Sequence, residues 1–234
     1  LRVIAERDCA DIIDRLASTR IAAPEAMRRC RRALAAYVAG AVVMPYEGFH
    51  AATRGLRNDL ELLALRFDAS FEQVCHRMTT LQRPRAAGIP MHFLRTDIAG
   101  NISKRFGGSG LWLPRYGGAC PRWVIHSAFL TPGRVVTQIA QMPDGQTFLF
   151  IARTKEASAG HGSPRSHHAI MVGCSIANAG AIVYADGLDL AAKAVPVGMT
   201  CSQCSRTDCA QRAFEQIPLG APVAPTHDSP AGRR

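Results

Sequence analysis

Three cysteines within nine residues form the stretch of the sequence that is best equipped for chemistry. Cys201, Cys204 and Cys209 follow the spacing C-x2-C-x4-C. Thiolates this close in sequence can bind one zinc ion or one iron–sulfur cluster, and a closed site of either kind takes four protein ligands. The motif therefore predicts a metal or cluster site whose fourth ligand comes from another part of the chain.

Two further cysteines lie beside turn signals and are candidates for the fourth ligand. Cys120 occupies a Gly- and Pro-containing turn before Trp123, and Cys174 lies at the end of a predicted strand. We favour Cys174, because its strand precedes the one that leads into Cys201 and successive elements usually lie side by side. Cys120 is the alternative. The remaining cysteines are expected to be small core residues on helices: Cys9, Cys30 and Cys75.

A second dense stretch, residues 95–110, combines three cations with hydroxyl, amide and glycine residues. The cations can neutralise a phosphorylated ligand, while the hydroxyl, amide and backbone N–H groups orient it. The glycines do not have the spacing of a Walker loop or of a dinucleotide-binding fingerprint. A solvated basic loop would have the same composition. The candidate phosphate ligands are Arg95, Asn101, Ser103, Lys104 and Arg105.

Motifs of hydrolytic enzymes are absent from the sequence. It contains neither HExxH nor GxSxG. A hydrolytic zinc site would use His or carboxylate ligands, whereas a cysteine-rich set favours structural zinc or an iron–sulfur cluster. We therefore do not predict an enzyme. The enzyme hypothesis that we keep is an acyl-CoA hydrolase or transferase, and turnover of acyl-CoA by the protein would support it.

Composition limits the class of protein further. The formal net charge of +10 comes almost wholly from arginine, which favours an anionic partner, although an arginine-rich solvated surface would give the same charge. Eight cysteines do not make a disulfide scaffold in a chain of this size, and no secretory signal or membrane-spanning apolar run is present. We expect a cytoplasmic protein with no membrane segment. Because the chain begins at Leu1 inside a helical pattern, we also expect further sequence upstream.

The elements that position these residues fall into two predicted domains. Residues 1–84 show helical periodicity, residues 85–216 alternate like a sheet protein, and residues 84–90 break the pattern between them. This predicts an α+β chain, with a helical domain followed by an antiparallel sheet that has helices on one face. Residues 217–234 hold four prolines and are predicted to form a disordered tail. The predicted strands are residues 91–96, 123–128, 134–141, 147–154, 168–173 and 194–198, with a hairpin turn at 143–145 and a short helix at 177–184.

Residues 59–78 have the pattern of helix, tight turn and helix. Ser70 and Gln73 form a capping-box pattern at the start of the second helix. As a helix-turn-helix, this pair would place Gln73, His76 and Arg77 against DNA. We favour a packed helical hairpin, because Glu61 and Glu72 would repel phosphates.

The sequence resembles the C-terminal regulatory half of the short-chain fatty acyl-CoA-responsive transcription regulators of bacteria. These XRE-type regulators control propionate, methylcitrate and glyoxylate-cycle genes. The resemblance covers about residues 30–214 and is carried by AVVMPY (41–46), RF and SFEQVCHR (66–77), TLQRP (80–84), AGNISKRF (99–106), GGACPRW (117–123), MPDG (142–145), IART (151–154), VYADG (183–187) and the terminal cysteine motif.

The resemblance implies a fold and a cofactor. Residues 85–216 would be an acyl-CoA sensor domain, and Cys201, Cys204 and Cys209 would be ligands of a [4Fe-4S] cluster near the effector site. Residues 1–84 would be the remnant of a metallopeptidase-like domain, which lacks the HExxH needed for catalysis. DNA binding would belong to an N-terminal helix-turn-helix that is missing from this chain.

On this interpretation, the cationic stretch attracts the phosphates of CoA or a short-chain acyl-CoA. Arg95, Lys104 and Arg105 would neutralise them, Asn101 and Ser103 would orient them, and Trp123 would help to form a small apolar pocket for the acyl group. Effector and cluster would stabilise one arrangement of a homo-oligomer, a dimer or a tetramer. The alternative is a DNA-binding helix-turn-helix module with a structural zinc site.

Overall fold

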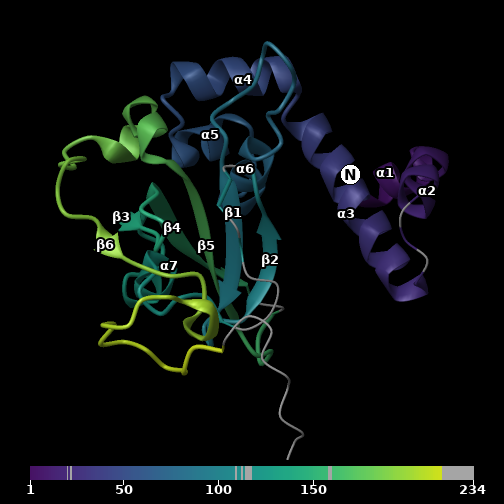
Figure 1. Ribbon diagram of the computed structural model, residues 1–234. Helices are drawn as coiled ribbons and strands as arrows, with labels where there is room; N and C mark the ends of the chain where they lie inside the picture. The colour runs from purple at the N-terminus through teal and green to yellow at the C-terminus, as the bar shows by residue number, and fades with distance from the viewer. Residues whose placement is uncertain are drawn as a thin grey trace, which may run out of the picture.

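A six-stranded sheet lies between a layer of helices and a second layer of loops and short helices (Figure 1). The structure, a computed structural model, describes residues 1–19, 21, 23–108, 110, 111, 113, 118–157 and 160–217. The predicted α+β class, with helices first and a mainly antiparallel sheet after them, is confirmed. The predicted tail, apart from Ile217, lies outside the described residues.

The first three helices lie to one side of the sheet (Figure 1). They are α1 (Arg2–Asp8), α2 (Ala10–Ser18) and α3 (Pro24–Val43). Pro24 takes the first position of α3, where its missing N–H costs no hydrogen bond, and the helix ends before Pro45. Large exposed apolar side chains are concentrated in this part of the chain: Leu1, Val3, Ile4, Ile12, Leu16, Tyr37 and Val42.

Helices α4 (Tyr46–Gly55), α5 (Leu60–Arg66) and α6 (Phe71–Met78) cover one face of the sheet. The predicted capping box of Ser70 and Gln73 is present at the start of α6. Helix α6 is a packed element, since Arg77 is buried and its Nε donates a hydrogen bond to the carbonyl of Met44 at 3.0 Å. This arrangement agrees with the favoured helical hairpin and leaves Arg77 unable to contact DNA.

The strands form one sheet in the order β2-β1-β5-β4-β3-β6. All neighbouring pairs are antiparallel except β3 and β6. The predicted turn at residues 143–145 joins β3 to β4, with Gly145 at φ +87° and Asp144 accepting a hydrogen bond from Gln146 N. The strands are β1 (His92–Asp97), β2 (Ile102–Phe106), β3 (Val136–Gln141), β4 (Thr147–Ala157), β5 (Ser166–Ser175) and β6 (Val195–Pro196).

Three local predictions differ from the structure. The predicted strand at 123–128 is wrong, because these residues form α7 (Val124–Ser127) and enter the 3₁₀ turn η1 (Ala128–Leu130). A short apolar run fits a buried helical turn as well as a strand, so periodicity alone could not separate them. Residues 102–106 form strand β2, where no strand was predicted; they lie within the candidate phosphate-binding stretch. The predicted helix at 177–184 is two 3₁₀ segments, η2 (Ile176–Ala181) and η3 (Val183–Ala185).

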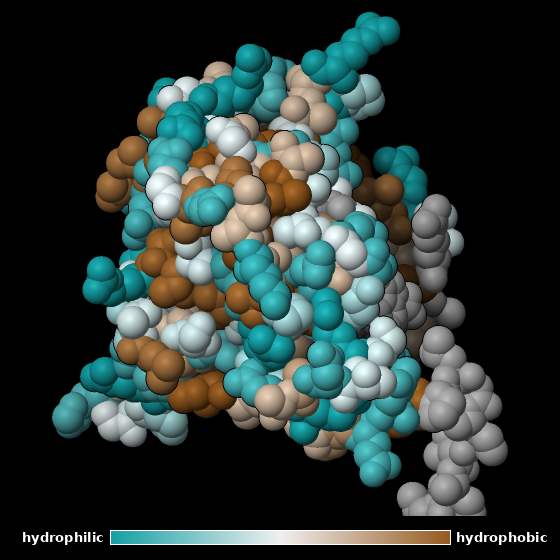
Figure 2. All heavy atoms as spheres, turned by 60° about the vertical axis from the view of Figure 1, so that its left-hand side comes forward, coloured by the Kyte–Doolittle hydropathy of each residue, from teal (hydrophilic) through white to brown (hydrophobic). Residues whose placement is uncertain are grey.

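Both faces of the sheet are buried, which also departs from the expectation of helices on one face. Phe93 and Ile151 face α4 to α6, while Leu94 and Phe150 face the layer that contains α7. Adjacent strand residues point to opposite faces, so each central strand supplies both cores. The outer face over β3 and β6 shows apolar atoms interspersed with polar ones (Figure 2).

The connection before α5 is tied to the segment after β5. Arg57 makes a bidentate ion pair with Asp186, at 2.7 and 2.8 Å. The Tyr184 hydroxyl accepts a hydrogen bond from Leu60 N at 3.1 Å and donates one to Asp59 Oδ1 at 3.2 Å. These contacts join the parts on either side of the predicted domain boundary and explain the VYADG motif physically.

We predict that Tyr184→Phe lowers the free energy of unfolding by about 1–2 kcal/mol, because the N–H of the buried Leu60 loses its acceptor. Urea denaturation followed by circular dichroism measures the change. Tyr37→Phe is the matched control, since Tyr37 is exposed. Equal midpoints for the Tyr184 variant and the wild type would contradict the assigned role.

Candidate functional site

Four cysteines line one small cavity next to the C-terminal loop: Cys120, Cys201, Cys204 and Cys209. The backbone holds the two segments together, since Cys120 N donates a hydrogen bond to the Met199 carbonyl at 2.9 Å. Gly198 N in turn donates to Cys120 Sγ at 3.4 Å. Three of the four residues were predicted as ligands from their spacing, and Cys120 was the alternative for the fourth.

Cys174 does not line this cavity. It lies on β5 opposite Leu149, fully buried in the core between the sheet and α4 to α6. Cys120 belongs to the core on the other face. Burial raises the pKa of the Cys174 thiol to about 12 and also raises the pKa of the Cys120 thiol, so the position of Cys174 on the other face of the sheet, not its pKa, separates it from the cavity. In the sheet, β5 does not lie next to β6, and Cys174 is on the face of β5 that points away from Cys120.

Two arginines organise the cysteine loop. The Arg212 guanidinium donates hydrogen bonds to the carbonyls of Cys201 and Cys204 at 3.1 Å, and also to that of Arg206. Arg206 donates to the carbonyls of Val197 and Gln141, both at 2.9 Å, and so fixes the loop to β3. The short turn η4 (Cys201–Gln203) is the only regular element that the structure describes in residues 197–212. The side chains of Arg206 and Arg212 therefore hold the loop in position.

The donor set fits an iron–sulfur cluster. A site lined by four cysteines matches the ligands that such clusters take, and Ala213 N donates to Cys201 Sγ at 3.5 Å, as backbone amides do toward cluster thiolates. Within the described ranges, no three His, Cys, Asp or Glu side chains are close enough to hold a single metal ion.

A second group of charges lies where α6 meets the sheet. The Glu72 carboxylate pairs with Arg95 at 2.9 Å, with Lys155 at 3.0 Å and with Lys104 at 3.7 Å. Arg95 and Lys104 are cross-strand partners on β1 and β2, and Lys155 comes from β4. Burial alone would raise the pKa of Glu72, but the Lys155 hydrogen bond and the three positive charges lower it below its ordinary value.

These charges border a cavity of about 500 Å³ between α3, α6, β2 and β4. Tyr37, His76 and Lys104 line it together with Glu72 and Lys155. Burial, and then the charge of Lys104, lower the pKa of His76 to about 4, so its imidazole is neutral near pH 7. Burial also lowers the pKa of Lys104. The cavity therefore offers a positive wall beside a neutral ring.

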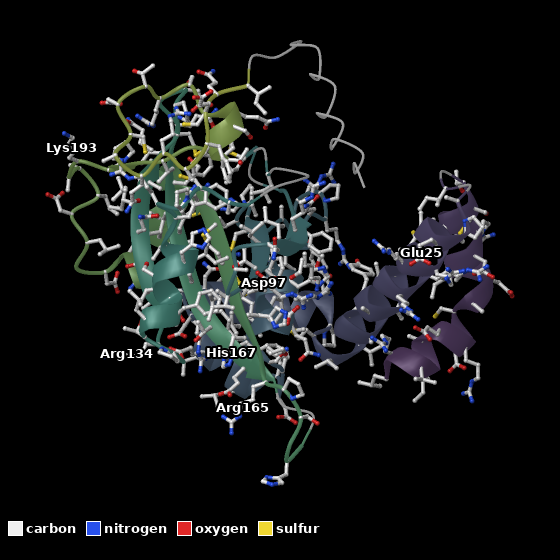
Figure 3. The ribbon with its side chains drawn as sticks, turned by 90° about the horizontal axis from the view of Figure 1, so that it is seen from below. Glu25, Asp97, Arg134, Arg165, His167 and Lys193 are labelled. Carbon is white, nitrogen blue, oxygen red and sulfur yellow. The ribbon has the colours of Figure 1, made fainter. Side chains whose placement is uncertain are left out.

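The structure divides the predicted phosphate ligands into two groups. Arg95 and Lys104 join the Glu72 group, and Ser103 accepts a hydrogen bond from Arg95 Nε at 2.9 Å. The other two lie elsewhere: Asn101 donates a hydrogen bond to Asp97, which is labelled in Figure 3, and Arg105 donates one to the Leu113 carbonyl. Trp123, which was predicted to help form the acyl pocket, lies in the opposite core.

Glu72 and Lys155 belong to the site but were not selected from the sequence. Glu72 was noted only as an unfavourable neighbour for phosphates. Lys155 lies far from the cationic stretch in sequence, and its place beside α6 depends on strand order. The scarcity of lysine was the available signal, since two of the three lysines, Lys104 and Lys155, lie in this cavity.

The chain belongs to the short-chain fatty acyl coenzyme A regulator family, whose C-terminal domain matches residues 80–229. Residues 11–79 match the IrrE N-terminal-like domain of the M78 peptidase family. The recognition made from the sequence motifs is therefore confirmed. No helix of the described part of the chain is long and apolar enough to cross a membrane.

Named relatives are transcription regulators. The chain is 49% identical over 203 residues to the HTH-type transcriptional regulator PrpR of Mycobacterium tuberculosis, covering 86% of this chain and 41% of that protein. It is 46% identical over 194 residues to the propionyl-CoA carboxylase regulator of Cereibacter sphaeroides, covering 82% of this chain and 42% of the relative. The chain thus spans about two fifths of the length of these relatives.

A solved structure of a Mycobacterium tuberculosis transcriptional regulator has the same fold. It superimposes with a TM-score of 0.88 at 43% sequence identity, and the match covers 97% of this chain and 70% of that one. The helical part and the sheet thus recur together in a regulator.

We predict that Gly198→Ala disturbs the cysteine cavity, because a Cβ at this position would lie 2.5 Å from Cys204 Sγ. Overpacking of about 1–3 kcal/mol would raise local opening by roughly fivefold to a hundredfold. The rate at which Cys204 in metal-free protein reacts with a thiol reagent, read by mass spectrometry, measures this. Gly180→Ala is the control, since nothing lies within 4 Å of its added Cβ. An unchanged rate in Gly198→Ala would show that the close packing is not required.

Proposed function

We propose that the chain is the ligand-sensing and oligomerisation part of a transcription factor. It binds CoA or a short-chain acyl-CoA such as propionyl-CoA, together with a [4Fe-4S] cluster, and controls genes of short-chain fatty acid catabolism. The observation that carries this proposal is the meeting of Cys120 with the three close cysteines in a member of the acyl-CoA regulator family.

Cys120, Cys201, Cys204 and Cys209 would hold the cluster, replacing the set with Cys174 that the sequence favoured. When bound, the cluster supplies a redox- and iron-dependent link between the loop and the sheet. Arg206 and Arg212 hold the loop backbone in place, and their positive charges offset the negative charge of four thiolates. Backbone N–H groups of Gly198 and Ala213 are directed at two of the sulfur atoms.

The effector would bind in the cavity beside α6. Lys104 and Lys155 line this cavity and provide positive charge that the phosphates of CoA require, and Arg95 adds charge beside them through its ion pair with Glu72. Tyr37 supplies an aromatic surface from α3 for the less polar part of the ligand. Trp123 faces the opposite layer, so the acyl pocket expected around it is not continuous with this cavity.

The remaining partners follow from the class of the relatives. DNA would be bound by an N-terminal helix-turn-helix of a longer cytoplasmic protein, and the chain would act through a change between states of a dimer or tetramer. The exposed apolar side chains of residues 1–43 favour association with another subunit. A DNA-binding module made of residues 59–78 with structural zinc is the weaker alternative, because Arg77 is buried.

We predict that Cys120→Ser abolishes cluster binding and that Cys174→Ser retains it, because Cys120 lines the cysteine cavity while Cys174 lies in the opposite core. Iron and acid-labile sulfide content of anaerobically purified protein, with absorbance at about 400 nm, measures the result. Loss of the cluster in Cys174→Ser with retention in Cys120→Ser would reverse the assignment. A colourless wild type that contains zinc alone would remove the cluster from the proposal.

We predict that propionyl-CoA binds to the chain and that free propionate does not, because the phosphates provide most of the attraction. Lys104→Met should weaken binding about tenfold, since it removes one charged contact. Lys193→Met is the matched control, because Lys193 is exposed and lies far from the cavity (Figure 3). Isothermal titration calorimetry measures all three proteins. Absence of binding to the wild type with its cluster intact would exclude the sensor function.

A further inference from the structure

Glu72 is surrounded by more positive charge than it can neutralise. Its side chain is 11% exposed, and it faces Arg95, Lys104 and Lys155 with a single carboxylate. Among the described residues that line the cavity, Glu72 is the one acidic side chain. The neutral His76 adds no charge near pH 7. The single carboxylate of Glu72 therefore faces three cations, of which Lys104 and Lys155 line the cavity, while Arg95 pairs with Glu72 without lining it. Arg2 and Arg77 add further positive charge to the lining.

The same carboxylate joins two parts of the fold. Glu72 lies in the first turn of α6, whereas its partners lie on β1, β2 and β4. Helix α6 also packs on the sheet through apolar residues such as Val74 and Met78. Loss of the ion pairs would thus loosen the junction between α6 and the sheet without unfolding it.

We propose that Glu72 is an internal counter-ion which the phosphate groups of the effector displace from Arg95, Lys104 and Lys155. A phosphate with two negative charges neutralises these cations better than one carboxylate does, and it repels the carboxylate when both are close. Binding in the cavity is then coupled to the junction of α6 with the sheet. The identity of the effector rests on the proposed function, whereas the displacement applies to any phosphate anion that fits.

The test compares Glu72→Gln with the wild type, using inorganic pyrophosphate and propionyl-CoA as separate probes in isothermal titration calorimetry. Removing the competing charge should tighten the binding of both probes about tenfold or more. If Glu72 only held the cations in place, its loss would instead weaken the binding of both probes. Glu61→Gln is the matched control, since Glu61 pairs a helix with Arg153 of the sheet at 3.2 Å outside the cavity. Its affinity should equal that of the wild type.

Equal or weaker binding of pyrophosphate to Glu72→Gln would overturn the displacement, and so would absence of pyrophosphate binding to both proteins. Wild-type protein that binds pyrophosphate but not propionyl-CoA would exclude the acyl-CoA effector. The affinities of Glu72→Gln and wild type for pyrophosphate would then decide on the displacement.

Hydrogen exchange on the wild type gives a second measurement that does not depend on the folding of a variant. The bound probe should speed exchange in α6 (Phe71–Met78) relative to α5, because α6 loses its ionic contacts with the sheet. Unchanged or slower exchange in α6 would overturn the coupling.

Discussion

The sheet depends on burial of both its faces, and the two candidate sites follow from this constraint. Neighbouring residues on the central strands point to opposite layers, as Phe93 and Leu94 do on β1. One layer, made of α4 to α6, brings Glu72 to the cations of the sheet. The other contains α7 and the turn that presents Cys120 to the cysteine loop. The cavity lined by Glu72, Lys104 and Lys155, called here the cation cavity, and the cysteine cavity therefore lie on opposite faces of one sheet.

The two sites are held by different interactions. At the cysteine cavity, arginine side chains and backbone carbonyls replace regular secondary structure, so the loop has a defined shape with few apolar contacts of its own. At the cation cavity, the charged groups lie on a helix and three strands that are fixed by packing. The central strands β1, β5 and β4 connect the two regions, because each supplies side chains to both cores. Coupling between the proposed effector and the proposed cluster would therefore have to pass through these strands.

The helical part and the sheet act as one structural unit. The core between them contains residues from α4 to α6 and from β1, β4 and β5, and the ion pair of Arg57 with Asp186 adds a second connection. The relative of known structure contains both parts, at a TM-score of 0.88. The helical domain, which lacks the HExxH motif, forms one wall of the candidate ligand cavity.

The sequence by itself determined the features that depend on local patterns: the α+β class, the capping box of α6, the turn at residues 143–145, the spacing of the three close cysteines and the motifs that define the family. Only the tertiary structure decided the features that depend on which face or strand a residue occupies. Strand periodicity does not show which face of the sheet packs against which layer. Only the structure therefore shows that Cys120, and not Cys174, lies beside the cysteine loop. Strand order brings Lys155 to Glu72, although more than eighty residues separate them. A short apolar run has no intrinsic preference strong enough to fix its form, so packing against the sheet made α7 a helix.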